Sequence, residues 1–209
     1  MSAARKIPED FRLSRNSKEI QLIILMMSSS DLPTSKVISK PWKSVFRDGL
    51  FTGKTALVTG GGTGLGYAIA KELALLGATV IIASRRLETC QAAAHELNAW
   101  LQQQQKFQNY PSVGRVIAGP STSIRKEEEI QALVAFCIAQ GGGLDLLVNN
   151  AGGQFVCPSE DLSRRGFAAV VETNLIGTFL VCREAYNQYM QEHGGSIVNI
   201  TLCNRNGEL

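Results

Sequence analysis

The sequence predicts an α/β fold in which helices cover both faces of a doubly wound parallel sheet. Apolar runs of strand length alternate with stretches of helical periodicity, and this alternation indicates β-α-β units with right-handed crossovers. The first apolar run leads through a glycine-rich turn at Thr59–Gly66 into a helical pattern. The strand segments read as uninterrupted apolar runs, as strands buried on both faces require.

The expected elements follow in order from these signals. Strands are predicted at Thr55–Thr59, Thr79–Ala83, Val113–Ile117, Leu144–Val148 and Ser196–Thr201, and helices at Gly64–Leu76, Leu87–Leu101, Lys126–Gln140 and Arg165–Gln191.

Local chemistry supports the boundaries. Gly77 ends the first helix, as a glycine just beyond the last turn commonly does, and β-branched residues favour the strand after it. Apolar positions of the second helix step by three and four residues, and the polar segment Gln102–Pro111 is expected to be a surface loop. The acidic run Glu127–Glu129 favours the start of the third helix through the helix dipole, and Gly141–Gly143 ends that helix.

Length and composition fit one globular domain preceded by an extension. The chain has 209 residues, of which 44% are hydrophobic and 19% are charged, and this length supports one domain with a substantial core. We expect residues 1–47 to be a flexible N-terminal extension and residues 48–209 to form the folded domain. The extension holds nine of the 21 Lys and Arg residues and four of the 18 Asp and Glu residues.

The composition also disfavours several classes of partner. The folded part is close to neutral, so no nucleic-acid partner is expected. The apolar run Ile20–Met27 is much shorter than the roughly 20 residues of a membrane span, so no membrane partner is expected. The five cysteines and two histidines are dispersed, which is typical of reduced thiols in an intracellular protein and predicts no metal site.

The glycine-rich turn predicts an anion site. Glycines let the backbone approach a diphosphate, and the helix that follows offers unpaired N–H groups and a partial positive charge. The residues expected to bind there are Thr59, Gly60, Gly62, Thr63, Gly64, Leu65 and Gly66.

The end of the second strand predicts which dinucleotide binds. An acidic residue there would bind the ribose 2′-hydroxyl and repel a 2′-phosphate, but the chain has Ser84, Arg85 and Arg86. A guanidinium can hold phosphate through two parallel hydrogen bonds. We therefore expect NADPH rather than NADH, with Arg85 as the main contact and Ser84 or Arg86 assisting. The alternative is that both arginines merely solvate the start of a helix.

Three motifs in register resemble the short-chain dehydrogenase/reductase family, whose fold is Rossmann-like. They are the spacing Thr59-Gly60-x-x-x-Gly64-x-Gly66, the run Asn149–Gly152 after the fourth strand, and Asn174 inside the long fourth helix. Asn174 takes the position of the family's structural and proton-relay asparagine. Asparagine is a poor residue in mid-helix because its side chain competes for backbone hydrogen bonds, which also indicates a functional role.

The resemblance implies further site residues. Asn150, Ala151 and Gly152 are expected to brace the sheet and the cofactor pocket. Ser123 and Ile124 are expected to line the adenine pocket, although Ser123 stands where an Asp or Asn is usual.

The segments Asn149–Phe155, Glu172–Phe179 and Glu192–Ile200 are similar to the peroxisomal trans-2-enoyl-CoA reductase branch of this family. The similarity implies hydride transfer from NADPH to the β-carbon of an enoyl-CoA thioester and protonation at the α-carbon. It also implies an acyl-CoA substrate, a homo-oligomer for a full-length form and a peroxisomal location. A dienoyl-CoA reductase and an alcohol or ketone dehydrogenase remain open. So do a cytoplasmic and a mitochondrial location, because Gly207–Leu209 does not resemble a Ser-Lys-Leu signal.

The family's proton donor is a Tyr-x-x-x-Lys pair on the helix after the fifth strand, with a serine just after that strand. The serine position falls at Leu202, and we expect no Tyr-x-x-x-Lys pair in the chain, which ends at Leu209. The domain is therefore expected to be C-terminally incomplete, and the chain to bind NADPH weakly without turnover. The alternative to an enzyme is a catalytically inactive nucleotide-binding short isoform.

Overall fold

The computed structural model describes residues 44–108, 112–154 and 157–201. All the described residues belong to one compact unit, Lys43–Leu209. Most of the predicted extension 1–47 lies outside the described residues, so its boundary stays a prediction. Within the folded unit, the Ser44 hydroxyl donates a hydrogen bond to the Glu72 carboxylate.

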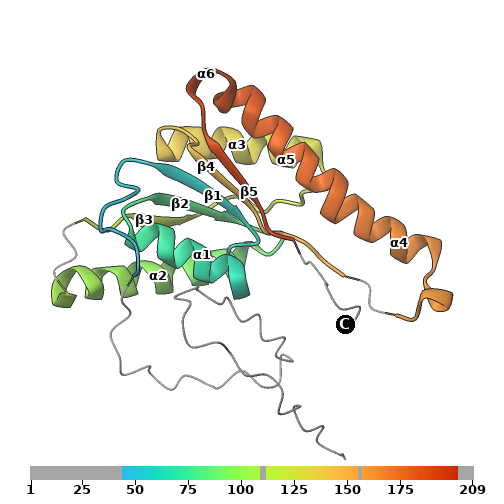
Figure 1. Ribbon diagram of the computed structural model, residues 1–209, viewed down its shortest axis with the longest axis horizontal. Helices are drawn as coiled ribbons and strands as arrows, with labels where there is room; N and C mark the ends of the chain where they lie inside the picture. Colours follow the sequence, from blue (N-terminus) through green and yellow to red (C-terminus); the bar gives the residue numbers. More distant parts are fainter. Residues whose placement is uncertain (1–43, 109–111, 155–156, 202–209) are drawn as a thin grey trace, which may run out of the picture. The chain divides into compact units, whose positions relative to one another are not determined.

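Five parallel strands form one sheet in the order β3-β2-β1-β4-β5. The strands are β1 (Thr55–Thr59), β2 (Thr79–Ala83), β3 (Arg115–Ala118), β4 (Leu146–Asn149) and β5 (Ser196–Asn199). The order reverses between β1 and β4, which places the carboxyl ends of these strands on either side of a topological switch point. The predicted Rossmann-like, doubly wound fold is confirmed (Figure 1).

Helices cover the sheet on both sides. They are α1 (Gly64–Leu75), α2 (Leu87–Gln108), α3 (Glu127–Gly141), α4 (Arg164–Val171), α5 (Thr178–Ala185) and α6 (Gln191–His193), with a short 3-10 helix, η1 (Ser159–Asp161). Figure 1 shows α1 and α2 on one face of the sheet and α3 and α5 on the other.

The alternation of side chains along the strands gives each face its own core. Val58 and Val80 pack with residues of α1 and α2 in one buried cluster. Leu57 and Ile81 pack with residues of α3 and α5 in the other. Successive residues of a strand point to opposite faces, so an uninterrupted apolar run is what both cores need.

The second helix is longer than the sequence pattern predicts. The segment expected to be a loop at Gln102–Pro111 is helical as far as Gln108. Gln104 is 8% exposed, because this extra length still packs on the domain. Glutamine is a good helix former, so a polar composition did not prevent the helix from continuing. The expected strand ends also shift: β3 begins at Arg115 and β5 ends at Asn199.

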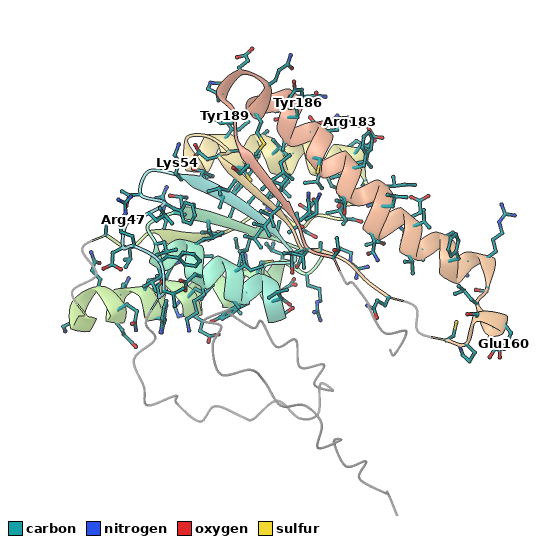
Figure 2. All side chains as sticks on the ribbon, in the orientation of Figure 1. Arg47, Lys54, Glu160, Arg183, Tyr186 and Tyr189 are labelled. Carbon is teal, nitrogen blue, oxygen red and sulfur yellow. The ribbon has the colours of Figure 1, made fainter. Side chains whose placement is uncertain are left out.

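One long helical segment runs from Arg164 to His193 and contains two π-helical turns, η2 (Glu172–Gly177) and η3 (Tyr186–Met190). Figure 2 shows Arg183 and Tyr186 on its α5 and η3 portions. By length and composition alone this segment could cross a membrane, although the core helix of a soluble protein meets the same test. The expectation of no membrane partner therefore stays a prediction.

The two edges of the sheet differ. At the β3 edge, the Asn98 side chain of α2 donates to the carbonyl of Val116 at 2.8 Å and accepts from its N–H at 2.9 Å. At the other edge, Ile197, Val198 and Ile200 are between 38% and 48% exposed.

Candidate functional site

A cavity of about 800 Å³ lies at the carboxyl ends of the strands. Its lining comes from the ends of β1 and β2, from the segments that follow β1, β2, β3 and β4, and from α2, α3, α4 and η2. The lining residues include Thr59, Gly60, Gly62, Thr63, Ser84, Arg85, Arg86, Thr89, Thr122, Ser123, Ile124, Arg125, Asn150, Ala151, Gly152, Gly153, Gln154 and Thr173. In open α/β sheets, ligands bind in the crevice at this end of the sheet.

Most of the residues predicted to bind the cofactor line this cavity. The exceptions are Gly64, Leu65 and Gly66, which form the first turn of α1 directly after the lining residue Thr63. Asn174 does not line the cavity, but its side chain contacts the lining residue Gly153. No ligand is present, so the binding roles of all these residues stay predictions.

The glycine turn is closely packed against neighbouring backbone. Gly60 has a φ of 67°, in the left-handed region that favours glycine. A Cβ atom on Gly66 would lie 2.4 Å from the carbonyl oxygen of Gly60 and 2.5 Å from Nδ2 of Asn150. The helix therefore starts close against the turn, and no larger residue fits at position 66.

Thr59 and Asn150 join the ends of β1 and β4. The Thr59 hydroxyl accepts hydrogen bonds from the N–H groups of Asn150 and Ala151, at 3.1 and 3.0 Å. The Asn150 side chain donates to the carbonyl oxygens of Thr59 and Gly60, at 3.0 and 3.3 Å. Both side chains therefore tie the ends of β1 and β4 together beside the cavity, and the bracing role of Asn150 in cofactor binding stays a prediction.

The start of α1 fits a diphosphate group. The first N–H groups of a helix have no partner within the helix, and Thr63 makes no side-chain capping hydrogen bond. The first turn of α1 carries no acidic side chain. The glycines leave room for a ligand to approach the backbone closely. At the same point, the unpaired N–H groups at the start of α1 attract an anion.

The part of the cavity beside the ends of β2 and β3 is positively charged. Arg85 and Arg86 follow β2, and Arg125 follows β3. No Asp or Glu is among the described residues that line the cavity. The Ser84 hydroxyl donates to the carbonyl of Arg86 at 3.1 Å and accepts from the N–H of Arg86 at 3.2 Å, so Ser84 shapes the turn that carries both arginines.

Sequence reasoning missed several lining residues. Arg125 comes two residues after Ser123, and the rule that strand ends gather could have pointed to it. Thr89 and Thr173 lie on α2 and η2, where only tertiary packing brings them to the cavity. No group of three potential metal ligands occurs in the described part of the chain.

A Tyr-x-x-x-Lys spacing does occur, at Tyr67 and Lys71, so the expectation that the chain has none is wrong. Both residues lie on α1 and face α2. Burial and a hydrogen bond with Glu96 raise the pKa of Tyr67. The Lys71 Nζ lies 4.1 Å from the centre of the Trp100 ring, and burial lowers the pKa of this lysine. Neither residue lines the cavity, so this pair packs α1 on α2. The serine position at Leu202 lies outside the described residues.

Comparisons with known proteins agree with this geometry. The short chain dehydrogenase family matches residues 54–204. A peroxisomal 2,4-dienoyl-CoA reductase of Danio rerio is 34% identical over 171 residues, which cover 82% of this chain and 53% of that protein. Its counterpart in Arabidopsis thaliana is 32% identical over 167 residues, which cover 76% of this chain and 51% of that protein. The chain spans about half the length of these curated relatives.

Solved structures are similar over the same region. A citronellol catabolism dehydrogenase of Pseudomonas aeruginosa aligns with a TM-score of 0.62 at 42% identity, over 76% of this chain and 59% of that one. A 7α-hydroxysteroid dehydrogenase in complex with NADH and 7-oxo glycochenodeoxycholic acid also has a TM-score of 0.62, at 30% identity, over 72% of this chain and 54% of that one.

Proposed function

Since the chain belongs to the short-chain dehydrogenase family, we propose that it carries the cofactor site of an NADPH-dependent oxidoreductase that reduces unsaturated acyl-CoA thioesters. Bound NADPH would supply a hydride to the β-carbon of an enoyl thioester, and the α-carbon would take a proton. The glycine turn and the start of α1 would hold the diphosphate. The loop after β4 would meet the nicotinamide end of the cavity.

The observation that carries this proposal is the arginine pair at the end of β2. Arg85 and Arg86 line the cavity where a carboxylate would be needed to bind the 2′-hydroxyl of NADH. A guanidinium favours the added charge of a 2′-phosphate and can hold it with two hydrogen bonds. This argument supports NADPH, although a dehydrogenase of similar fold has been solved with NADH.

Two lines of support favour an acyl-CoA substrate. Curated relatives are named 2,4-dienoyl-CoA reductases. The Gly152-Gly153-Gln154 sequence, which resembles the enoyl-CoA reductase branch, places an amide side chain at the cavity. Both a trans-2-enoyl-CoA and a 2,4-dienoyl-CoA thioester are therefore candidate substrates.

Calorimetric titration with NADPH and NADH tests the cofactor. We expect tighter NADPH binding, and a loss of about tenfold for NADPH alone in Arg85→Ala, because a charge-assisted hydrogen bond to phosphate is worth about 1.5 kcal/mol or more. Arg47→Ala is the matched control, since Arg47 is exposed and does not line the cavity (Figure 2). Equal affinities for the two dinucleotides in the unmodified chain would overturn the NADPH assignment.

A second function is nucleotide binding without turnover. No Tyr or Lys is among the described residues that line the cavity, so none of them supplies the family's proton donor. The purified 209-residue chain should be mixed with NADPH and crotonyl-CoA, and separately with a 2,4-dienoyl-CoA. Oxidation of NADPH with either thioester supports the enzyme and excludes this second function, and the thioester consumed faster identifies the substrate.

The names of the same relatives support a proposal about location. We propose a peroxisomal location, because curated relatives carry that name, with the cytoplasm and the mitochondrion as alternatives. We also propose a homo-oligomer for a full-length form. Imaging of a fluorescent fusion and light scattering of the purified protein test these two statements.

A further inference from the structure

The turn that carries the two arginines is fastened by the loop that follows β3. The Ser121 hydroxyl donates a hydrogen bond to the carbonyl of Arg85 at 2.9 Å. The N–H of the next residue, Thr122, donates to the carbonyl of Ser84 at 3.0 Å. Two successive carbonyls of the arginine turn are therefore bound by two successive residues of the neighbouring loop.

The third carbonyl of the turn is also bound. The carbonyl of Arg86 accepts from the Ser84 hydroxyl at 3.1 Å and from the N–H of Cys90 at 3.4 Å. All three carbonyls of residues 84–86 thus have donors supplied by the protein. A carbonyl whose hydrogen bond is satisfied internally has less tendency to turn toward an anion and repel it, so the turn can offer guanidinium donors to a ligand.

The fastening loop is itself held in place. Thr122 is 3% exposed and donates its hydroxyl to the carbonyl of Pro120 at 2.9 Å. The N–H of Ser123 donates to the Glu129 carboxylate of α3 at 2.7 Å, and the same carboxylate pairs with Lys126 at 2.7 Å. The hydrogen bond from Lys126 and that from the N–H of Ser123 lower the pKa of Glu129. The loop is therefore a firm support for the arginine turn.

We propose that Ser121 is a positioning residue for recognition of the 2′-phosphate, acting through the backbone of Arg85. This inference rests on the proposed function, because it assigns a task within the NADPH site. Ser121 need not touch the cofactor. It fixes the direction of the peptide that follows Arg85, and thereby the place at which the guanidinium meets the phosphate.

Ser121 suits a mutational test because its side chain is exposed, so its removal leaves no buried cavity. The change is Ser121→Ala, with Ser121→Thr to restore the hydroxyl. Ser112→Ala is the control, since Ser112 also lies in a loop near β3 and its hydroxyl contacts Thr52 rather than the turn. Calorimetry measures the dissociation constants for NADPH and NADH, and thermal unfolding without cofactor checks the fold of each variant.

We expect Ser121→Ala to weaken NADPH binding about three- to tenfold, as loss of one hydrogen bond would, and to leave NADH binding within about twofold. Ser121→Thr and Ser112→Ala should bind both dinucleotides like the unmodified chain. An unchanged preference for NADPH in Ser121→Ala overturns the inference while leaving the NADPH site intact. An equal loss for both dinucleotides, or a lowered Tm, also overturns it, because the serine would then be structural. Failure of the unmodified chain to prefer NADPH rejects the proposed function itself.

Discussion

The side-chain amide of Asn174 is hydrogen-bonded to both backbone groups of Gly153: its Oδ1 accepts from the N–H at 2.9 Å, and its Nδ2 donates to the carbonyl at 2.8 Å. Asn174 lies in the π-helical turn η2, and Gly153 follows β4. The Asn174 amide thus satisfies both backbone hydrogen-bonding groups of Gly153, as a paired strand would. The resemblance to the short-chain dehydrogenase family predicts a proton-relay role for Asn174, and in the structure Asn174 also holds the loop beside the cavity.

Asn174→Ala is therefore expected to loosen the loop after β4. Loss of these bonds should speed hydrogen exchange of the Gly153 amide about fivefold or more, corresponding to about 1 kcal/mol. Exchange measured residue by residue tests this. Thr173→Ala is the control, because the Thr173 hydroxyl bonds only within its own helix, to the carbonyl of Ala169. Equal exchange rates of the Gly153 amide in both variants would show that the Asn174–Gly153 hydrogen bonds do not stabilise the loop.

Gly66→Ala should destabilise the domain. The added methyl would sit 2.4 Å from the Gly60 carbonyl oxygen, so the glycine turn or α1 must move, at a cost of about 1–3 kcal/mol. Denaturation in urea measures that cost. Gly153→Ala is the matched control for stability, because a Cβ there meets nothing within 4 Å. If both variants unfold at the same urea concentration, the close packing at Gly66 is not a constraint.

The strands and the strand-end residues could be predicted because they obey simple rules. A strand buried on both faces must be apolar throughout, and Thr79–Ala83 is found at its predicted bounds. Parallel strands bring their carboxyl ends together, so Ser84, Ser123 and Asn150 could be placed near one another from the sequence. The same rule fails for Thr89 and Thr173, which reach the cavity from helices.

The features that could not be predicted depend on tertiary contact. Nothing in the composition of Glu172–Gly177 distinguishes a π-helical turn from an ordinary helix. In the structure, a Cβ on Gly177 would lie 2.8 Å from the carbonyl oxygen of Ile124, so this helix approaches the loop after β3 closely. The polar composition after Leu101 likewise predicted a loop. In the structure α2 continues to Gln108, and both Leu101 and Gln104 are buried.

Asn98→Ala should weaken the β3 edge. The Asn98 side chain satisfies both backbone groups of Val116, and it covers an edge that could otherwise pair with another chain. We expect the free energy of unfolding to fall by about 1–2 kcal/mol and light scattering on warming to begin earlier. Gln103→Ala, an exposed change on the same helix, is the comparison. A variant as stable and as soluble as Gln103→Ala would argue against this role.

The ion pair between Lys54 and Asp145 should make stability depend on pH. Their charged groups lie 2.8 Å apart at the start of β1, and Asp145 also accepts from the N–H of Thr55 at 2.8 Å. Burial acts to raise the pKa of Asp145, but the hydrogen bonds from Lys54 and Thr55 outweigh it and hold the pKa below its usual value. The hydrogen bond and charge of Asp145 raise the pKa of Lys54.

The pKa shifts of Asp145 and Lys54 define the pH range in which this ion pair stabilises the fold. A lowered carboxyl pKa stabilises the fold above the unfolded value of about 3.9, and this contribution is lost as the pH falls through the folded pKa. A raised lysine pKa stabilises the fold below about 10.4, and this contribution is lost as the pH rises through the folded pKa. Urea denaturation across this range should show Asp145→Asn less stable than the unmodified chain near neutral pH, with the difference shrinking at both extremes. Asp161→Asn, an exposed change in η1, should follow the unmodified chain. A difference for Asp145→Asn that stays constant with pH would mean that packing, and not charge, accounts for it.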